Sequence, residues 1–213
     1  MVCKIGKYQR VLNMKNELKK IYLDKKIDIK SRLIDFKNIK EEDKYYEFIF
    51  CMLTPQSKAQ KCWEAVQEIK KLEKKTNINI NKILKTRTRF HNNKTKYLIE
   101  SEKIWPEVKL KLNNSNKKEI RNWIADNIYG MGLKEAGHFL RNVGHSNNEI
   151  AILDRHILRN LKKVNLIEDD KIKSKKDYFR IEDIFLKYAQ SLNIPADELD
   201  LLFWSQENGE IFK

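Results

Sequence analysis

The sequence predicts an all-α protein, and three observations support this fold class. Apolar residues recur at helical spacing in most segments of the 213-residue chain. Alternation of apolar and polar residues, the pattern of a strand, is scarce. Only six glycines and three prolines are available to interrupt the helices. A chain of this length fits one globular unit or two small subdomains that share a cleft.

The charge balance favours a polyanionic partner. Lys and Arg total 44 against 30 Asp and Glu, which leaves a formal net charge of +14. Such an excess is typical of proteins that bind nucleic acid. The chain is also rich in Lys, Ile and Asn together, a bias that codon usage alone can produce. Charge by itself therefore supports nucleic acid only weakly.

The cysteines and histidines exclude the common metal sites. Cys3, Cys51 and Cys62 are too few and too far apart for a cluster, and the four histidines have no zinc-type spacing. An odd number of cysteines suits reduced thiols. No segment resembles a signal sequence, and no apolar run could span a bilayer. We therefore expect a cytoplasmic monomer that uses no cofactor and no metal and binds no membrane.

The first half of the chain reads as a series of helices. Residues 1–40 form basic amphipathic pieces that serve as scaffold. Residues 45–53 are apolar nearly all round, which predicts a buried helix. That helix stops at residues 54–56, Thr-Pro-Gln, and the next begins at Ser57, where Gln60 completes a capping box.

Residues 87–94 read Arg-Thr-Arg-Phe-His-Asn-Asn-Lys. Cations interleaved with one aromatic ring form a surface for phosphate binding and base stacking. An ordinary polar loop with Phe90 in the core fits the same residues, so both interpretations stay open at this point. Helix resumes over residues 97–112.

The last third returns to helix after a polar stretch. Residues 162–176 are charged and predict an exposed connector, and residues 178–192 are amphipathic. The last helix begins near Pro195 and ends at Gly209. Trp204 lies beside the buried stripe of that helix, so we expect it to border a cavity.

Residues 127–138 read Asn-Ile-Tyr-Gly-Met-Gly-Leu-Lys-Glu-Ala-Gly-His. Apolar residues recur at helical spacing on both sides, so residues 117–143 are expected to form helix, glycine hairpin and helix. Gly130 and Gly132 permit a positive φ or the close approach of another backbone. The open amides at the start of the second helix would bind an anion, most naturally a phosphate of nucleic acid.

Lys134 lies in the first turn of that second helix. The helix dipole disfavours a positive charge there, so the neutral, nucleophilic amine is expected. The side chain should project onto the face of His138 and Arg141, away from the buried stripe. On position alone, a solvated surface lysine is the commoner alternative.

Asp154 follows an apolar, strand-like run, residues 151–153, and stands at the start of another helix. Its ordinary role is to cap that helix. A capping aspartate has a second carboxylate oxygen, which it can present to a cleft. Asp154 is therefore a candidate catalytic carboxylate.

Residues 130–134, Gly-Met-Gly-Leu-Lys, and residues 153–156, Leu-Asp-Arg-His, resemble the hairpin-lysine and aspartate motifs of the helix-hairpin-helix DNA glycosylases. Further segments extend the similarity to the archaeal-type 8-oxoguanine DNA glycosylase/AP lyases. The four-cysteine iron–sulfur signature of some related glycosylases is missing. We expect two helical subdomains, residues 42–145 and residues 1–41 with 146–213, and a DNA-binding cleft between them.

The resemblance implies roles for residues that physical chemistry alone leaves open. Gln56 would fill the gap left by an extruded base, while Phe90 and Trp204 stack on the two faces of that base. The terminal Lys213 would distinguish 8-oxoguanine, whose N7 is a donor, from guanine, whose N7 is an acceptor. Without that role, the short tail would be expected to fray. The remaining DNA contacts are expected from Arg87, Arg89, Lys94, Gly130 and Gly132.

The resemblance also implies the reaction. Lys134 would attack C1′ of the deoxyribose and displace 8-oxoguanine from duplex DNA, and ionised Asp154 would stabilise the charge that develops on the sugar. The resulting Schiff base allows β-elimination at the abasic site. Two alternatives stay open: an oxidised-pyrimidine glycosylase/lyase of the same superfamily, and a helix-hairpin-helix DNA-binding module without catalysis.

Overall fold

The computed structural model describes residues 2–213, and it describes the side chains from residue 13 onward except that of Asn208. Cys3 therefore lies outside the described side chains. Every regular element is a helix, and no strand occurs among the described residues, which confirms the predicted all-α class. No described helix combines the length and the apolar character that a bilayer span requires.

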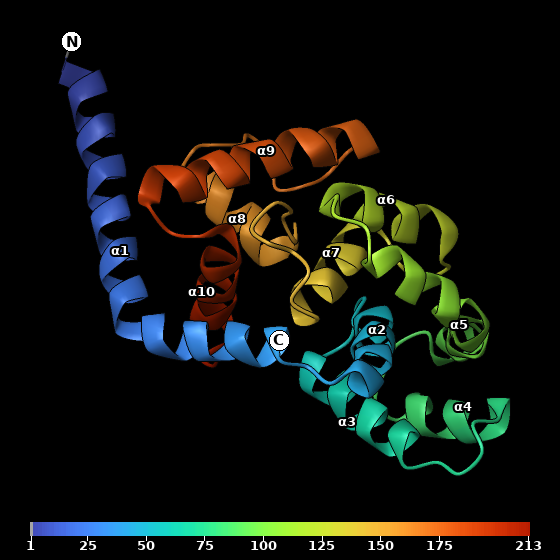
Figure 1. The fold of residues 1–213 in the computed structure, drawn as a ribbon. Coiled ribbons are helices and arrows are strands. Elements are labelled where there is room, and N and C mark those ends of the chain that lie inside the picture. Colours follow the sequence, from blue (N-terminus) through green and yellow to red (C-terminus); the bar gives the residue numbers. More distant parts are fainter. Residues whose placement is uncertain (1) are drawn as a thin grey trace. The chain divides into compact units, whose positions relative to one another are not determined.

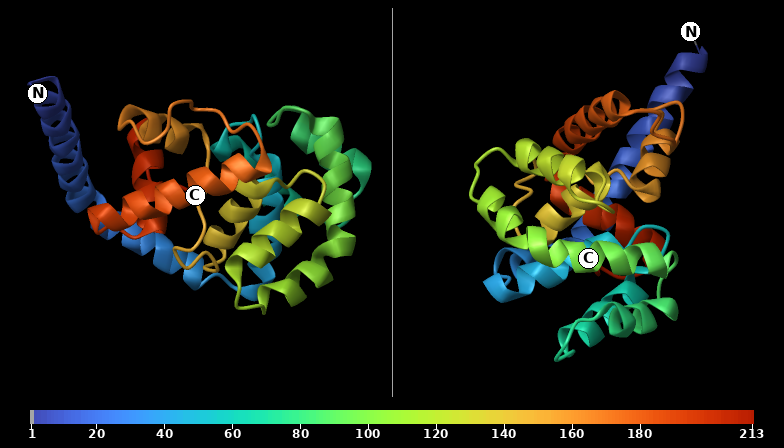
Figure 2. Two further views of the ribbon diagram at one scale, coloured as in Figure 1. Left: turned by 90° about the horizontal axis from the view of Figure 1, so that it is seen from above. Right: turned by 90° about the vertical axis from the view of Figure 1, so that its right-hand side faces the viewer.

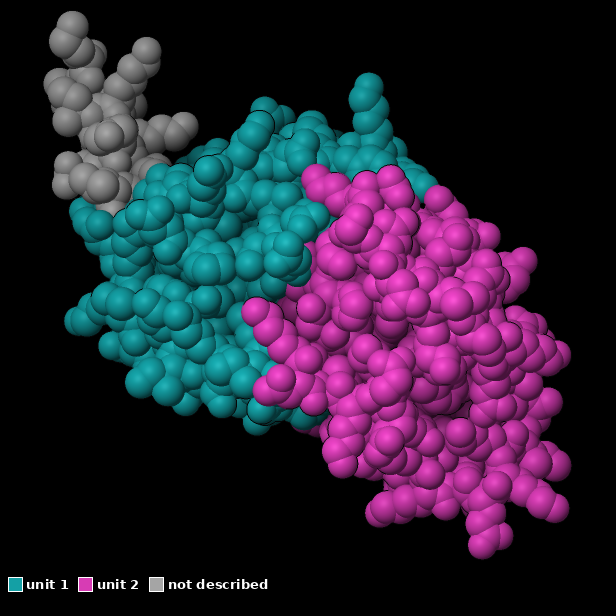
Figure 3. Space-filling view, in the orientation of Figure 1, with its two compact units in different colours: residues 1–35, 147–213 teal, residues 36–146 magenta. Residues whose placement is uncertain are grey.

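The chain divides into two compact units (Figure 3). Unit 1 comprises residues 1–35 and 147–213, and unit 2 comprises residues 36–146. The helix-hairpin-helix segment lies in unit 2, and the segment around Asp154 lies in unit 1. Each unit has its own apolar core.

Unit 1 is built from the two ends of the chain (Figure 1). The N-terminal residues form one continuous helix, α1 (Val2–Lys37), where the sequence predicted separate pieces. The other helices are α8 (Arg155–Lys163), α9 (Lys175–Leu192) and α10 (Ala196–Asn208), and α10 packs against both α8 and α9.

Unit 1 ties α1 to α10 through a buried polar contact. The hydroxyl of Tyr22 donates to Oε2 of Glu198 at 2.6 Å. Burial of the phenol and this hydrogen bond raise the pKa of Tyr22 well above its ordinary value. Ile29, two turns after Tyr22 on the same face of α1, is fully buried. The N-terminal helix is therefore part of the scaffold of unit 1, as the sequence suggested.

Unit 2 is organised around α2 (Lys44–Leu53), which packs against α3, α5 and α7. Residues 47–53 are all buried, which confirms the prediction of a helix that is apolar nearly all round. Phe48 of α2 contacts both Trp105 of α5 and Phe139 of α7, with ring centroids 5.5 and 5.2 Å apart. Figure 2 shows α3 beside α4 and α6 beside α7. The other elements of unit 2 are η1 (Glu41–Asp43), α3 (Ala59–Lys70), α4 (Asn77–Lys85), α5 (His91–Leu112), α6 (Lys117–Asn127) and α7 (Leu133–Asn142).

The predicted capping box at the start of α3 is wrong. The helix begins at Ala59, and no side chain caps it. The hydroxyl of Ser57 instead accepts hydrogen bonds from the backbone N–H of Arg89 at 3.0 Å and from Nζ of Lys94 at 2.9 Å. The Ser57 hydroxyl, which local sequence rules would assign to the N-cap of α3, is therefore bonded to Arg89 and Lys94 instead.

Candidate active site

The hairpin between α6 and α7 has the predicted helix-hairpin-helix form. Ile128 ends α6, its carbonyl accepts from the N–H of Met131 at 3.2 Å, and α7 starts directly after Gly132. Ile128 and Met131 are buried, whereas Tyr129 is exposed at the tip. Residues 125–132 line a surface hollow of about 520 Å³. The turn therefore presents its backbone to the outside.

The two hairpin glycines are needed for different reasons. Gly130 has a φ of +85°, and a Cβ built on it would lie 2.6 Å from Cδ2 of Tyr97. Gly132 has an ordinary extended backbone, with φ −86° and ψ −177°. It stands at the N-cap of α7 without a side chain to cap the helix, so the first amides of α7 stay open to an external acceptor. Only Gly130 meets the expectation of a positive φ.

Lys134 is the second residue of α7, and its side chain is about one-quarter exposed (26%). Lys134 shares a helix face with His138 and Arg141, as predicted from their spacing, but that face is buried rather than open: His138 and Arg141 are 8% and 3% exposed. The helix packs against both α2 and α6, and residues 136–142 are all buried. Only the first turn of α7 is open, so Lys134 reaches the surface because of its place at the helix start.

The amine of Lys134 has charges of both signs near it. Oε1 of Glu135 is 3.0 Å from Nζ of Lys134, so a carboxylate stands beside the amine at the positive end of α7. The charge of the Lys94 ammonium interacts unfavourably with that of Lys134. Glu135 was not among the residues predicted from the sequence, although an acidic residue in a first helical turn was a signal for it. The neutral amine expected from the helix dipole stays a prediction.

Asp154 caps α8, as predicted. Its Oδ1 accepts from the N–H groups of both His156 and Ile157, each at 2.8 Å. Its Oδ2 accepts no hydrogen bond from any described residue. The cap therefore uses one carboxylate oxygen and leaves the other available to a ligand.

The run before Asp154, which is strand-like in sequence, has no regular secondary structure, and the N–H of Asp154 donates to the carbonyl of Ile152 at 2.7 Å. Ala151 is held to α9 from both sides: its N–H donates to Oε1 of Glu182 at 2.8 Å, and its carbonyl accepts from Tyr178 Oη at 2.7 Å. Ile150 and Leu153 are buried. These contacts fix the backbone that delivers Asp154 to the start of α8.

Gln56, Arg89 and Phe90 lie on the surface of unit 2. Phe90 is 53% exposed, which rules out the alternative that its ring fills the core. The guanidinium of Arg89 lies 5.4 Å from the centroid of the Phe90 ring. Gln56 and Phe90 have left-handed backbones, with φ of 55° and 57°. That conformation costs about 1–2 kcal/mol for a residue with a Cβ, and such strain is common at ligand-binding positions.

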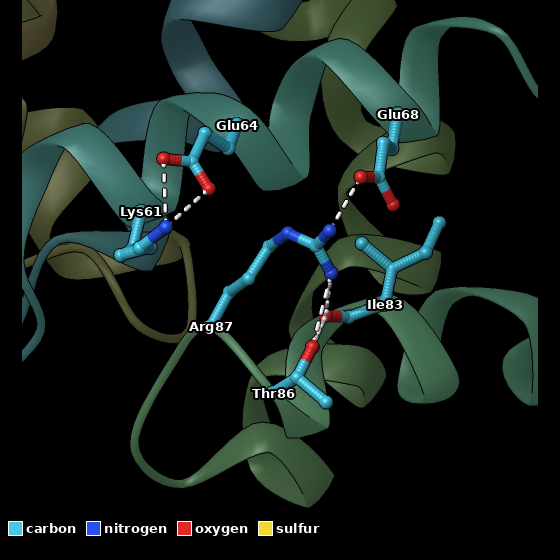
Figure 4. Close-up of polar contacts among 6 residues, drawn as sticks. All are labelled: Lys61, Glu64, Glu68, Ile83, Thr86 and Arg87. Carbon is cyan, nitrogen blue, oxygen red and sulfur yellow. Dashed lines mark hydrogen bonds and ion pairs between the residues drawn. The ribbon is translucent and has the colours of Figure 1, made fainter.

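Two of the predicted DNA contacts, Arg87 and Lys94, are bound by other groups of unit 2. The guanidinium of Arg87 forms an ion pair with Glu68 and donates to the carbonyl of Ile83 at 3.2 Å (Figure 4). Lys94 is only 4% exposed, and its Nζ is bound by oxygens of unit 2. Lys94 is therefore buried away from DNA, whereas Arg87 is half-buried in a surface ion pair and stays a predicted contact; of the three cations only Arg89 is exposed.

The C-terminal tail lies against α10. The ring centroid of Phe212 is 6.3 Å from that of Trp204, with 31° between the ring planes. Trp204 and Lys213 are partly exposed, whereas Phe203 and Ser205 beside Trp204 are buried. Trp204 therefore stands at the border of the buried stripe, as the sequence predicted.

The predicted site residues divide between the two units. Unit 2 carries Lys134 with the hairpin, Gln56 and Phe90, and unit 1 carries Asp154, Trp204 and Lys213. Among the described side chains, no group of three or more His, Cys, Asp or Glu is arranged to hold a metal ion.

Comparison with known proteins identifies relatives along nearly the whole chain. The sequence model of a family described as 8-oxoguanine DNA glycosylase matches residues 29–194. A protein of Fusobacterium nucleatum named 8-oxoguanine DNA glycosylase/AP lyase is 44% identical over 211 residues, which cover 93% of this chain and 97% of that protein.

Two solved structures from Methanocaldococcus jannaschii share the fold. An 8-oxoguanine DNA glycosylase is 28% identical with a TM-score of 0.86, over 97% of this chain and 99% of that one. An 8-oxoguanine glycosylase/lyase in complex with a 15mer DNA containing 8-oxoguanine is 32% identical with a TM-score of 0.82, over 92% and 99%.

The two hairpin glycines should respond differently to a methyl group. Gly130→Ala should cost about 2 kcal/mol or more of unfolding free energy, because it forces a positive φ and a contact with Tyr97. Gly132→Ala should cost about 1 kcal/mol or less, since its φ is ordinary and its nearest neighbour is the flexible Glu135 carboxylate. Urea unfolding of both variants measures the difference, and equal losses would contradict this account of the turn.

Proposed function

Since the chain belongs to the 8-oxoguanine DNA glycosylase family, we propose that it excises 8-oxoguanine from duplex DNA and then cleaves the strand at the abasic site it has made. The observation that carries this function is the match over 93% of the chain to a protein named 8-oxoguanine DNA glycosylase/AP lyase. The DNA complex of a structural relative supports damaged duplex DNA as the partner.

The nucleophile in our proposal is Lys134. Its amine attacks C1′ of the damaged nucleotide, so that a C1′–Nζ bond forms as the bond from C1′ to the base breaks. The base leaves with the bonding electrons and is protonated on release. Opening of the sugar then gives a Schiff base. Loss of a C2′ proton from this intermediate expels the 3′ phosphate, which is the β-elimination step.

Asp154 stabilises the positive charge that develops on the sugar as the base departs. Its Oδ2 is the oxygen available for this task, because both cap hydrogen bonds go to Oδ1. The open amides after Gly132 bind a DNA phosphate close to Lys134. Gln56, Phe90, Trp204 and Lys213 contact the extruded base or the gap that it leaves.

We further propose that the protein acts as a monomer on DNA in the cytoplasm. Every group assigned to the reaction comes from a single chain, which supports a monomer. Cys51 and Cys62 form no disulfide among the described residues, which suits a reducing compartment.

Lys134→Gln should abolish the covalent intermediate. Borohydride reduction during reaction with 8-oxoguanine DNA should trap wild-type protein on DNA, and the variant should give at least about a thousandfold less trapped complex, since an amide cannot form a Schiff base. Lys103→Gln, a change at an exposed lysine of α5, serves as the matched control and should trap normally. Trapping that survives Lys134→Gln would remove Lys134 from its role.

Asp154→Asn should separate the two roles of the aspartate. Asparagine is an equally good N-cap, so the unfolding free energy should change by less than about 0.5 kcal/mol. Single-turnover excision should nevertheless fall at least about a hundredfold, because the carboxylate charge is lost. Asp154→Ala should lose the same activity and, in addition, about 1 kcal/mol of stability with the cap. A fully active Asp154→Asn enzyme would show that the charge has no catalytic part.

Deletion of Lys213 should impair recognition of the base more than cleavage of the strand. Excision of 8-oxoguanine should fall at least about tenfold, the equivalent of one lost hydrogen bond to a buried polar group. Cleavage of a preformed abasic site should fall less, because that substrate has no base to recognise. Lys213→Ala, which keeps the chain length, shows whether the side chain or the terminal carboxylate matters. Equal losses on both substrates would refute a recognition role for the tail.

A further inference from the structure

The loops that carry Gln56 and Phe90 in unit 2 meet at a single polar node. Nζ of Lys94 donates to the carbonyls of Leu53 and Pro55, at 2.7 and 2.9 Å, and to the hydroxyl of Ser57 at 2.9 Å. The Ser57 hydroxyl also accepts the backbone N–H of Arg89 at 3.0 Å. One ammonium and one hydroxyl therefore connect the turn at residues 54–57 to the loop that leads into α5.

The charge at this node is buried without a carboxylate partner. Lys94 is 4% exposed, and all three of its acceptors are neutral oxygens. Burial lowers the pKa of the Lys94 ammonium below its ordinary value. The carbonyl of Leu53 lies at the C-terminus of α2, where the helix dipole favours a positive charge. The ammonium is thus held by helix and turn carbonyls, and it is too deep to reach a DNA phosphate.

The backbone next to the node is strained at two positions. Six non-glycine residues have a positive φ in the described part of the chain, and four of them are asparagine, which tolerates that conformation. The other two are Gln56 and Phe90. Gln56 lies between two acceptors of Lys94, and the carbonyl of Phe90 accepts the N–H of Lys94 at 3.0 Å. Such conformations persist only where surrounding contacts enforce them.

We propose that Lys94 is a positioning residue for lesion recognition, which locks the Gln56 turn and the Phe90 loop in their strained conformations and so presents both side chains to DNA. This inference rests on the proposed function for the roles of Gln56 and Phe90. The lock itself is a property of unit 2 in the free protein. The two parts are therefore tested separately.

Hydrogen exchange on the full-length chain tests the lock. Lys94→Met keeps the length of the side chain but removes all three donors. Peptides covering residues 53–58 and 86–91 should both exchange at least about tenfold faster in this variant, since their shared hydrogen bonds are gone. Lys96→Met removes the same charge from an exposed position on the same helix and is the matched control, with exchange unchanged.

If Lys94→Met does not fold, Ser57→Ala tests whether the shared hydrogen bonds hold the two loops. It removes the oxygen that joins the two loops and leaves the ammonium with its two carbonyls. Both peptides should again exchange faster, although by a smaller factor than in Lys94→Met. Wild-type exchange in both peptides of the folded variant would overturn the lock.

Activity on two substrates tests the consequence for recognition. Lys94→Met or Ser57→Ala should lower single-turnover excision of 8-oxoguanine at least about tenfold, while borohydride trapping on a preformed abasic site should fall less than about threefold. A residue that only stabilised the fold would lower both equally, and equal losses would overturn the positioning role. A wild-type enzyme inactive on 8-oxoguanine DNA would refute the proposed function instead, and hydrogen exchange would still decide on the lock.

Discussion

The first turn of α7 has more backbone donors than its own helix can satisfy, and the candidate site is arranged around that excess. A glycine at the N-cap, Gly132, supplies no side chain to fill the need. Gly130 closes the turn in a conformation and a space that no other residue fits well. The amides are left open to an anion, and Lys134 projects from the only turn of α7 that the rest of unit 2 does not cover. Glu135 adds a carboxylate beside the amine.

The C-terminus of another helix of unit 2, α2, is satisfied by buried donors. The C-terminal carbonyl of Leu53 accepts both Nζ of Lys94 and, at 3.2 Å, the thiol of Cys62. Burial raises the pKa of Cys62 to about 11, so this thiol is a neutral donor. Unit 2 thus directs the open start of one helix outward and satisfies the end of another with buried donors. The first arrangement suits an anionic ligand, and the second holds the turn at residues 54–57 against α5.

The two candidate catalytic groups lie in different units, and each is positioned at the start of a helix. Lys134 stands at the start of α7 in unit 2, and Asp154 at the start of α8 in unit 1. Each follows a short non-helical segment whose backbone is anchored: Gly130 against Tyr97, and Ala151 to Glu182 and Tyr178. A helix start gives a side chain a defined direction without burying it. Both reacting groups therefore combine a fixed backbone with access to substrate.

The sequence by itself determined the features that depend on neighbours three or four residues apart. The all-α class, the hairpin at residues 117–143, the cap at Asp154 and the border position of Trp204 follow from helical periodicity and local hydrogen bonding. The hydrogen-bond partners of Ser57 and Lys94, and the burial of His138 and Arg141, depend on the tertiary structure and could not be predicted from the sequence. Ser57 and Lys94 bond to partners 32 to 41 residues away, and such pairs leave no periodic trace in the chain. His138 and Arg141 are buried beside aromatic rings from distant parts of the chain: the Phe50 ring of α2 lies 5.7 Å from the ring of His138, and the Phe36 ring of α1 lies 5.6 Å from the guanidinium of Arg141.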